Sequence, residues 1–193
     1  MTMNNTREKI LDTATRLFYL KGYHATGLNL IIKESGAPKG SLYYHFPNGK
    51  EQLAIEAIEV SKKAVGQSIM HFLNTHENAV DAIQAHIQTM ADLFTSEEGI
   101  NSDSLAVMPF GLIAAESAFE NENMRNACNE TFRYWESLYA QKIIAQGYSV
   151  ESATTIATTI NAMIEGAVTL SSSQKSNEPL LRIKLMVPRL FKQ

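Results

Sequence analysis

The stretch Glu34-Ser35-Gly36-Ala37-Pro38-Lys39-Gly40-Ser41-Leu42-Tyr43-Tyr44-His45-Phe46 decides the fold of this chain. Residues 28–35, which lead into it, repeat apolar side chains at the three- and four-residue steps of a short amphipathic helix. Gly36 can take a positive φ and end that helix in a sharp turn. Pro38 suits the first turn of a second helix, where its missing N–H leaves no hydrogen bond unmade. The pattern predicts two short helices joined by a tight turn.

The second of these helices has one inward and one outward side. Leu42 and Phe46 are four residues apart, so both are expected to face the core. Its other faces carry one cationic and two phenolic side chains, those of Lys39, Tyr43 and Tyr44. Gly40 and Ser41 are small, so the backbone there could approach a phosphate or a base edge. This combination favours contact with DNA.

At these residues the chain resembles the TetR family of transcriptional regulators. The family pattern of Gly, three variable residues, Gly, Ser or Thr, Leu, Tyr, any residue, His and Phe is met from Gly36 to Phe46, and Gly22-Tyr23 with Thr26 matches the entry to the motif. Within the family, the chain resembles the group that contains the LmrA and YxaF repressors at residues 21–23, 25–29, 34–43 and 46–51. The resemblance covers about residues 6–53 and is traceable through 161–166.

The resemblance implies a role for each residue of the motif. Lys39 and Gly40 would face base edges, and the residues expected near phosphates or bases are Thr26, Ser41, Tyr43, Tyr44, His45 and Lys50. Thr26 can equally serve only as the N-cap of the next helix, and His45 as a core or capping group. Pro38 replaces the family's common Ser or Thr, and Pro47-Asn48-Gly49 makes the link to Lys50 one residue longer.

The charge is distributed unevenly along the chain. Its 193 residues have a formal net charge of −3, with 45% hydrophobic and 19% charged residues. Residues 1–53 hold seven Lys or Arg against four Asp or Glu, a net charge of +3, and the remainder carries −6. A basic segment on an acidic body suits phosphate binding by one end, because cations that neutralise phosphates release counterions.

The sequence predicts a soluble, cytoplasmic protein. No apolar run is long enough to span a bilayer, and residues 1–5 do not resemble a signal peptide. Cys128 is the only cysteine, which excludes an internal disulfide or a cysteine metal cluster and suits a reducing compartment. We expect Cys128 to be a small apolar residue in a helix core.

The periodicity predicts an all-α fold. The resemblance implies two domains: a helix-turn-helix DNA-binding domain of three helices over residues 1–50, and a helical ligand-binding and dimerisation domain over residues 51–193. Helices are expected over residues 6–21, 28–35, 50–73 and 105–119. Further helices are expected from Asn78 to about Phe94, from Asn123 as N-cap to Ile143, from Ser149 as N-cap to Ser172, and from Pro179 to just before Pro188. By resemblance, the helix from Lys50 is a lever whose tilt changes the spacing of two recognition helices.

The apolar helices of the second domain must bury their faces on one another or on a partner. By resemblance, the last two helices pair with their copies in a homodimer; the stripe of Ile156, Ile160 and Ile164 fits such an interface and fits an ordinary core equally well. The middle helices would enclose a ligand. Its aromatic, Met and polar candidate residues are Met108, Phe110, Glu116, Phe132, Trp135, Tyr139, Asn161 and Glu165, with a buried core as the alternative for the aromatic stripe.

Enzymatic activity is not expected. His71 and His76 are five residues apart and point to different helix faces, no metal-binding spacing is seen, and no phosphate-binding glycine loop occurs. No cofactor or metal is expected. The sequence is typical of a ligand-responsive repressor that binds a palindromic double-stranded DNA operator as a dimer. Its inducer would be a small hydrophobic or aromatic molecule, with flavonoids and antibiotics as the classes that the resemblance suggests. The alternative is a DNA-binding protein of the same fold that is controlled by protein partners.

Overall fold

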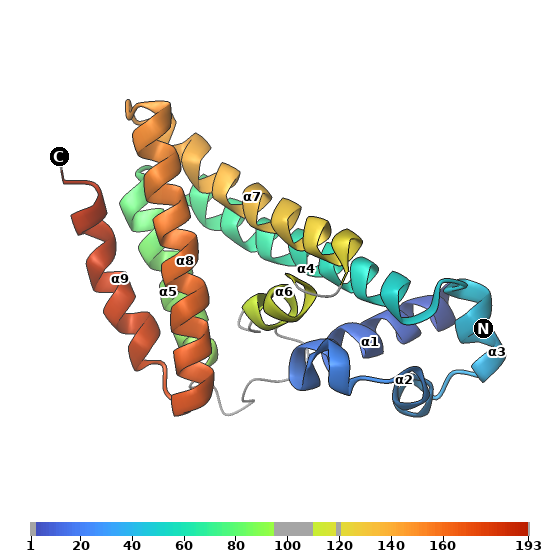
Figure 1. Ribbon diagram of the computed structural model, residues 1–193. Helices are drawn as coiled ribbons and strands as arrows, with labels where there is room; N and C mark the ends of the chain where they lie inside the picture. The colour runs from blue at the N-terminus through green and yellow to red at the C-terminus, as the bar shows by residue number, and fades with distance from the viewer. Residues whose placement is uncertain (1–2, 95–109, 119–120, 193) are drawn as a thin grey trace. The chain divides into compact units, whose positions relative to one another are not determined.

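The computed structural model describes residues 3–94, 110–118 and 121–192. Within these ranges the chain forms helices and no strand, which confirms the all-α prediction (Figure 1). The helices are α1 (Met3–Ala25), α2 (Leu28–Ser35), α3 (Lys39–His45), α4 (Gly49–Thr75), α5 (Ala79–Leu93), α6 (Phe110–Ala118), α7 (Glu122–Ile144), α8 (Val150–Gln174) and α9 (Glu178–Leu190). None of them is both long and apolar enough to cross a bilayer.

The chain divides into two compact units. The first contains the described residues up to Ser61 and those from Phe110 to Thr131. The second contains the described residues from Lys62 to Phe94 and those from Phe132 onward. The first unit therefore holds α1, α2, α3 and α6 with the beginnings of α4 and α7. This grouping differs from the predicted division at residue 50, because α6 packs against α1.

The first unit has a core built on α1, which packs against α2, α3 and α6. The predicted inward side chains of α1 are all buried: Ile10, Ala14, Leu17 and Phe18. The helical conformation breaks at Gly22, whose φ is 82° and ψ is 165°. The predicted end of this helix at residue 21 therefore coincides with a kink, and the chain makes one more helical turn to Ala25.

The turn between α2 and α3 forms as the sequence predicts. Gly36 has a φ of 62°, in the left-handed region, and its N–H donates to the carbonyl of Ile32 over 3.1 Å. Leu42 and Phe46 are fully buried. Pro38, expected in the first turn of α3, instead precedes the helix as its N-cap, with a φ of −58° and a ψ of 138°.

Two of the predicted helix caps are wrong and one is confirmed. Gly27, not Thr26, is the N-cap of α2. α7 begins at Glu122, and Asn121 rather than Asn123 accepts from the N–H of Met124, over 3.0 Å. Ser149 caps α8 as predicted, and Asn78 caps α5, a cap that was not among the predictions. Each side chain accepts from the N–H three residues on.

In the second unit, α9 packs against α5 and α8 (Figure 1). α9 continues through Pro188 to Leu190, beyond its predicted end, and buries Leu180 and Val187. Ile156, Ile160 and Ile164 of α8 are also buried within the single chain, so this stripe is core.

Candidate nucleic-acid interface and helical body

α3 exposes the side chains expected to contact DNA. Lys39 and Gly40 are exposed, and Tyr43 and Tyr44 expose 47% and 72% of their surface. Among the described residues, no heavy atom lies within 4 Å of the position that a Cβ on Gly40 would take. The start of α3 therefore presents a cation, an open backbone and two phenols on one short helix.

Ser41, His45 and Lys50 lie at the edge of this surface and are half-buried. The His45 ring lies edge-on to Tyr44, with centroids 5.0 Å apart. The Lys50 Nζ lies 4.1 Å from the centroid of the Tyr23 ring, so the ring face holds the ammonium at the beginning of α4.

Thr26 does not belong to this surface. Its side chain is fully buried, and its hydroxyl oxygen lies 2.8 Å from the carbonyl oxygen of Gly22 and 3.1 Å from that of Leu17. A hydroxyl held between two carbonyls in the core is out of reach of a phosphate. We therefore remove Thr26 from the expected DNA-contacting residues.

A polar network supports the loop between α3 and α4. The backbone N–H of Asn48 donates to the Gln52 side chain, which in turn donates to Glu56 over 3.0 Å. Arg7 of α1 donates to the other Glu56 oxygen over 2.6 Å, and its guanidinium lies 4.9 Å from the Phe46 ring centroid. The longer link that follows α3 is thus tied to both α1 and α4.

The residues predicted to bind a ligand fall into both units. Phe110 and Glu116 lie on α6 in the first unit. The Phe110 ring is buried 6.5 Å from that of Tyr19, and Glu116 accepts from the backbone N–H of Tyr23. Both side chains therefore contact α1. Met108 lies outside the described residues.

The second unit holds the other five candidates. Phe132 and Trp135 pack edge to face on α7, and the indole N–H of Trp135 donates to the carbonyl of Lys62 over 3.1 Å. The Asn161 amide donates to a Glu136 oxygen over 3.3 Å and so bridges α8 to α7.

Tyr139 contacts His86 of α5, a residue that the sequence does not single out as a ligand-binding candidate. His86 Nδ1 lies 2.9 Å from the Tyr139 hydroxyl, and His86 Nε2 is buried without a hydrogen-bond partner among the described residues. Burial and the nearby Glu165 carboxylate raise the pKa of the Tyr139 phenol. The sequence has no signal for this pairing, because α5 and α7 are distant along the chain.

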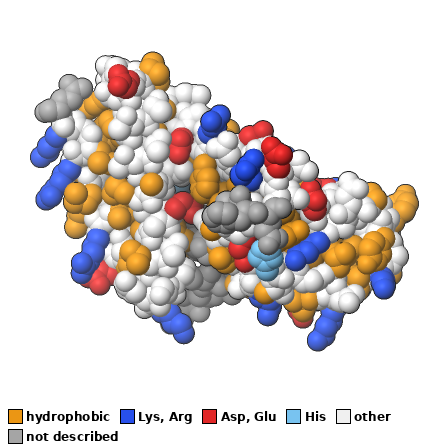
Figure 2. Space-filling model, in the orientation of Figure 1, with side chains coloured by type: hydrophobic (Ala, Val, Ile, Leu, Met, Phe, Trp, Pro, Cys, Tyr) orange, Lys and Arg blue, Asp and Glu red, His pale blue; other side chains and the backbone are white. Residues whose placement is uncertain are grey.

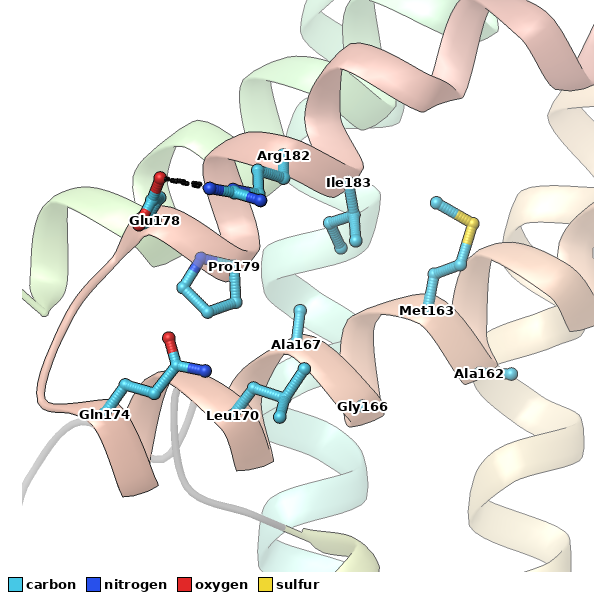
Figure 3. Close-up of a pocket in the computed structure, with 10 residues that line it drawn as sticks. All are labelled: Ala162, Met163, Gly166, Ala167, Leu170, Gln174, Glu178, Pro179, Arg182 and Ile183. Carbon is cyan, nitrogen blue, oxygen red and sulfur yellow. Dashed lines mark hydrogen bonds and ion pairs between the residues drawn. The ribbon is translucent and has the colours of Figure 1, made fainter.

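A groove of about 510 Å³ runs between α8 and α9 (Figure 3). Met163, Ala167 and Leu170 of α8 face Pro179 and Ile183 of α9 across it, as Figure 3 shows. An ion pair of 2.6 Å between Arg182 and Glu178 lies at its edge.

Hydrophobic side chains continue outward from this groove. Leu170, Leu185 and Met186 expose 52%, 71% and 41% of their surface. Figure 2 shows hydrophobic side chains interspersed with Lys and Arg over this part of the second unit. These exposed side chains and the lining of the groove together form the apolar face of α8 and α9.

Two family models match the chain. The model of the tetR family of bacterial regulatory proteins matches residues 10–57, which include α2 and α3. The model of the C-terminal domain of LmrA/YxaF-like transcriptional regulators matches residues 79–186.

Individual relatives agree with these matches. The chain is 46% identical to the HTH-type transcriptional regulator LmrA of Bacillus subtilis over 193 residues, 100% of both chains. It is 46% identical to the regulator YxaF of the same organism over 189 residues, 98% of this chain and 96% of YxaF. The crystal structure of reduced Escherichia coli NemR, a transcriptional repressor, superposes with a TM-score of 0.78 at 26% identity over 95% of both chains.

The matched proteins are regulators of transcription and not enzymes, as the sequence predicts. Regulators of this family bind operator DNA as dimers and respond to small molecules. With its helix-turn-helix in residues 28–45 and its full-length similarity to LmrA, the chain belongs to the TetR family of bacterial transcriptional regulators and carries an LmrA/YxaF-like C-terminal domain.

Proposed function

We propose that this protein is a dimeric repressor that binds a palindromic operator through α3 and is released by a small hydrophobic or aromatic inducer. The observation that carries the proposal is the exposed start of α3, where Lys39 and Gly40 present a cation and open backbone beside two exposed phenols. Lysine donates to guanine N7 and O6, and phenolic hydroxyls donate to phosphate oxygens.

The position of each side chain suggests how DNA contacts are divided. Lys39 and Gly40 begin α3 and face base edges in the major groove. Tyr43 and Tyr44, one turn later, reach phosphates, and Lys50 adds a phosphate contact from the start of α4. Ser41 and His45 line the edge of the same surface, where their half-buried side chains orient the exposed ones.

Dimerisation uses the apolar face of α8 and α9. The occupant that fits this face is a second copy of the chain, because a two-fold axis brings the same hydrophobic residues together from both subunits. Leu170, Leu185 and Met186 then leave solvent, and Arg182 stays at the rim. Two α3 helices sit in successive major grooves about 34–36 Å apart on the operator.

The inducer contacts the second unit near Tyr139 and Glu165. Tyr139 of α7 brings its phenol next to the neutral imidazole of His86 on α5, and the Glu165 carboxylate of α8 is near enough to raise the pKa of that phenol. His86 Nε2 is buried without a hydrogen-bond partner among the described residues, and the Phe72 ring lies 5.4 Å from the His86 ring. An inducer with a hydroxyl or carbonyl that opens this core would find a hydrogen-bonding nitrogen there. Flavonoids and antibiotics with aromatic hydroxyls have this chemistry.

The experiment that tests the proposal starts from the protein itself. We would select duplexes from a random pool with the purified full chain, and then measure affinity and stoichiometry on the selected duplex at several salt concentrations. We expect a palindrome with two subunits per site and an affinity that falls steeply with salt. A panel of hydroxylated flavones and aromatic antibiotics is then titrated against the complex.

The outcomes are separable. Release by one compound identifies the inducer class. A selective palindrome that no compound releases favours control by a protein partner over the inducer. A pool from which no sequence is enriched would contradict the repressor function as a whole.

A further inference from the structure

Glu116 of α6 holds the corner that follows the regular part of α1. The backbone N–H of Tyr23 donates to Glu116 Oε2 over 2.5 Å. Gly22 makes this approach possible, since a Cβ on Gly22 would lie 2.7 Å from Glu116 Oε1 and 3.1 Å from Oε2. The φ of 82° at Gly22 is likewise one that residues with side chains rarely adopt. The glycine and the carboxylate thus form one contact between α6 and α1.

The same corner carries a residue of the proposed DNA surface. The Tyr23 ring packs against Phe18 of α1, with centroids 5.7 Å apart, and the Lys50 Nζ lies 4.1 Å above its face. Whatever fixes the backbone at Tyr23 therefore also fixes the ring on which the Lys50 ammonium rests. Glu116 makes that backbone contact.

The corner also leads directly into the helix-turn-helix. The Gly22 carbonyl oxygen lies 2.8 Å from the Thr26 hydroxyl, and the Thr26 N–H donates to the carbonyl of Tyr23 over 3.2 Å. Gly27, the next residue, is the N-cap of α2. A displacement of the corner would therefore be felt at the start of α2 as well as at Lys50.

We infer that Glu116 is a positioning residue for operator binding: it fixes the corner from Gly22 to Thr26 and, through the Tyr23 ring, the ammonium of Lys50. The inference rests on the proposed function, because Lys50 is there assigned a phosphate contact. It replaces the ligand-binding role that the sequence suggested for Glu116.

Electrostatics alone predicts the opposite result for removal of this carboxylate. A protein that loses one negative charge in its DNA-binding unit attracts phosphates more strongly. A loss of positioning weakens DNA binding instead. The sign of the change in operator affinity therefore separates the two effects.

The test compares Glu116→Ala and Glu116→Asp with Glu122→Ala, a change at an exposed carboxylate of the same unit. Asp keeps the charge but is one methylene too short to reach the N–H of Tyr23. The probe is the duplex that the wild-type protein selects from a random pool. We expect both Glu116 variants to bind it about threefold to tenfold more weakly, with a salt slope reduced by about one per subunit. Glu122→Ala should bind as tightly as wild type or slightly more tightly.

Two further variants locate the effect. Glu116→Gln keeps a carbonyl oxygen that can accept from the N–H of Tyr23, so it should retain most of the affinity. In a Lys50→Met background, Glu116→Ala should reduce operator affinity by a smaller factor than in the wild type, because both changes act on the Lys50 contact and only the effect at the start of α2 remains. Thermal unfolding followed by circular dichroism shows that each variant is folded.

The results that overturn the inference are specific. If both Glu116 variants match Glu122→Ala in operator affinity and in salt slope, Glu116 has no positioning role. If Glu116→Ala lowers operator affinity by the same factor in the Lys50→Met background as in the wild type, Glu116 does not act through Lys50. If the wild-type protein selects no duplex at all, the proposed function is contradicted. That result is distinct from the variant results that would contradict the positioning role of Glu116.

Discussion

His86 Nδ1 lies 2.9 Å from the hydroxyl oxygen of Tyr139, and this pair joins α5 to α7 inside the second unit. Burial lowers the pKa of the His86 imidazole to about 4, so the ring is neutral at physiological pH. The unfolded chain holds this proton with a pKa near the usual 6.5. The difference between the two states makes stability depend on pH.

We predict that His86 destabilises the fold as the solution becomes acidic. Between pH 6.5 and pH 4 the unfolded state binds a proton that the folded state does not, so stability present above pH 6.5 is lost as the pH falls toward 4. The loss amounts to about 3 kcal/mol relative to a His86→Phe variant. Urea unfolding of both proteins at pH 7, 5.5 and 4 measures it. Parallel pH profiles would contradict the assigned burial.

Gly66 of α4 is required by the ring of Tyr134 on α7. A Cβ at residue 66 would lie 2.5 Å from Tyr134 Cε1. Alanine favours a helix over glycine by about 1 kcal/mol, but the clash should outweigh this gain. We expect Gly66→Ala to lower the free energy of unfolding by about 1–2 kcal/mol.

The matched control for Gly66 removes the neighbouring ring. In a Tyr134→Ala background, Gly66→Ala should become neutral or stabilising, because only the helix propensity then remains. Chemical unfolding of the four proteins completes the cycle. An equal cost in both backgrounds would place the origin of the effect elsewhere.

We predict that Cys128 is chemically inert in the folded protein. Its side chain is 3% exposed, and burial raises the pKa of its thiol to about 11, although a contact with Ser117 acts in the opposite direction. The thiolate is the reactive form, and little of it exists at pH 7.5. Reaction with a disulfide reagent should be at least about a hundredfold faster in denaturant than under native conditions. Similar rates in both would refute this.

Lys39→Ala tests direct base readout by α3. A base-edge contact specifies one position of each half-site. The variant should therefore lose about 1–3 kcal/mol of binding free energy on the selected duplex, and it should lose base selectivity at that position only. Lys50→Ala, which removes the proposed phosphate contact at the start of α4, is the comparison and should weaken all duplexes equally. Competition binding against single-base variants of the selected duplex separates the two patterns. Unchanged selectivity of Lys39→Ala would remove Lys39 from the readout.

Leu185→Glu tests the proposed dimer face. Leu185 is 71% exposed in the single chain, and two glutamates brought together by a two-fold axis would be buried and repel each other. We expect monomers by sedimentation at micromolar concentration and loss of operator binding. Leu20→Glu, at a residue 51% exposed on α1, should leave the dimer intact. A dimeric Leu185→Glu protein would place the interface away from α9.

Local patterns were enough to predict most helices, because hydrophobic period, glycine turns and caps act over a few residues. Gly36 in the left-handed region, Leu42 and Phe46 in the core, and the cap at Ser149 follow from such rules. The predicted ends of helices agree less well with the structure than the helices themselves do. α9 continues through Pro188, since a proline near a helix end removes few hydrogen bonds that neighbouring residues need.

The sequence by itself determined the helix-turn-helix, the all-α class and the family, because each depends on residues within one short segment or on its pattern. Only the tertiary structure decided that Thr26 is buried, that Glu116 contacts the backbone beside Gly22, and that His86 meets Tyr139. Glu116 and Tyr23 are 93 positions apart in the sequence, and His86 and Tyr139 are 53 positions apart. Such pairs depend on how whole helices pack, and a local pattern carries no record of which side chain lies across the interface.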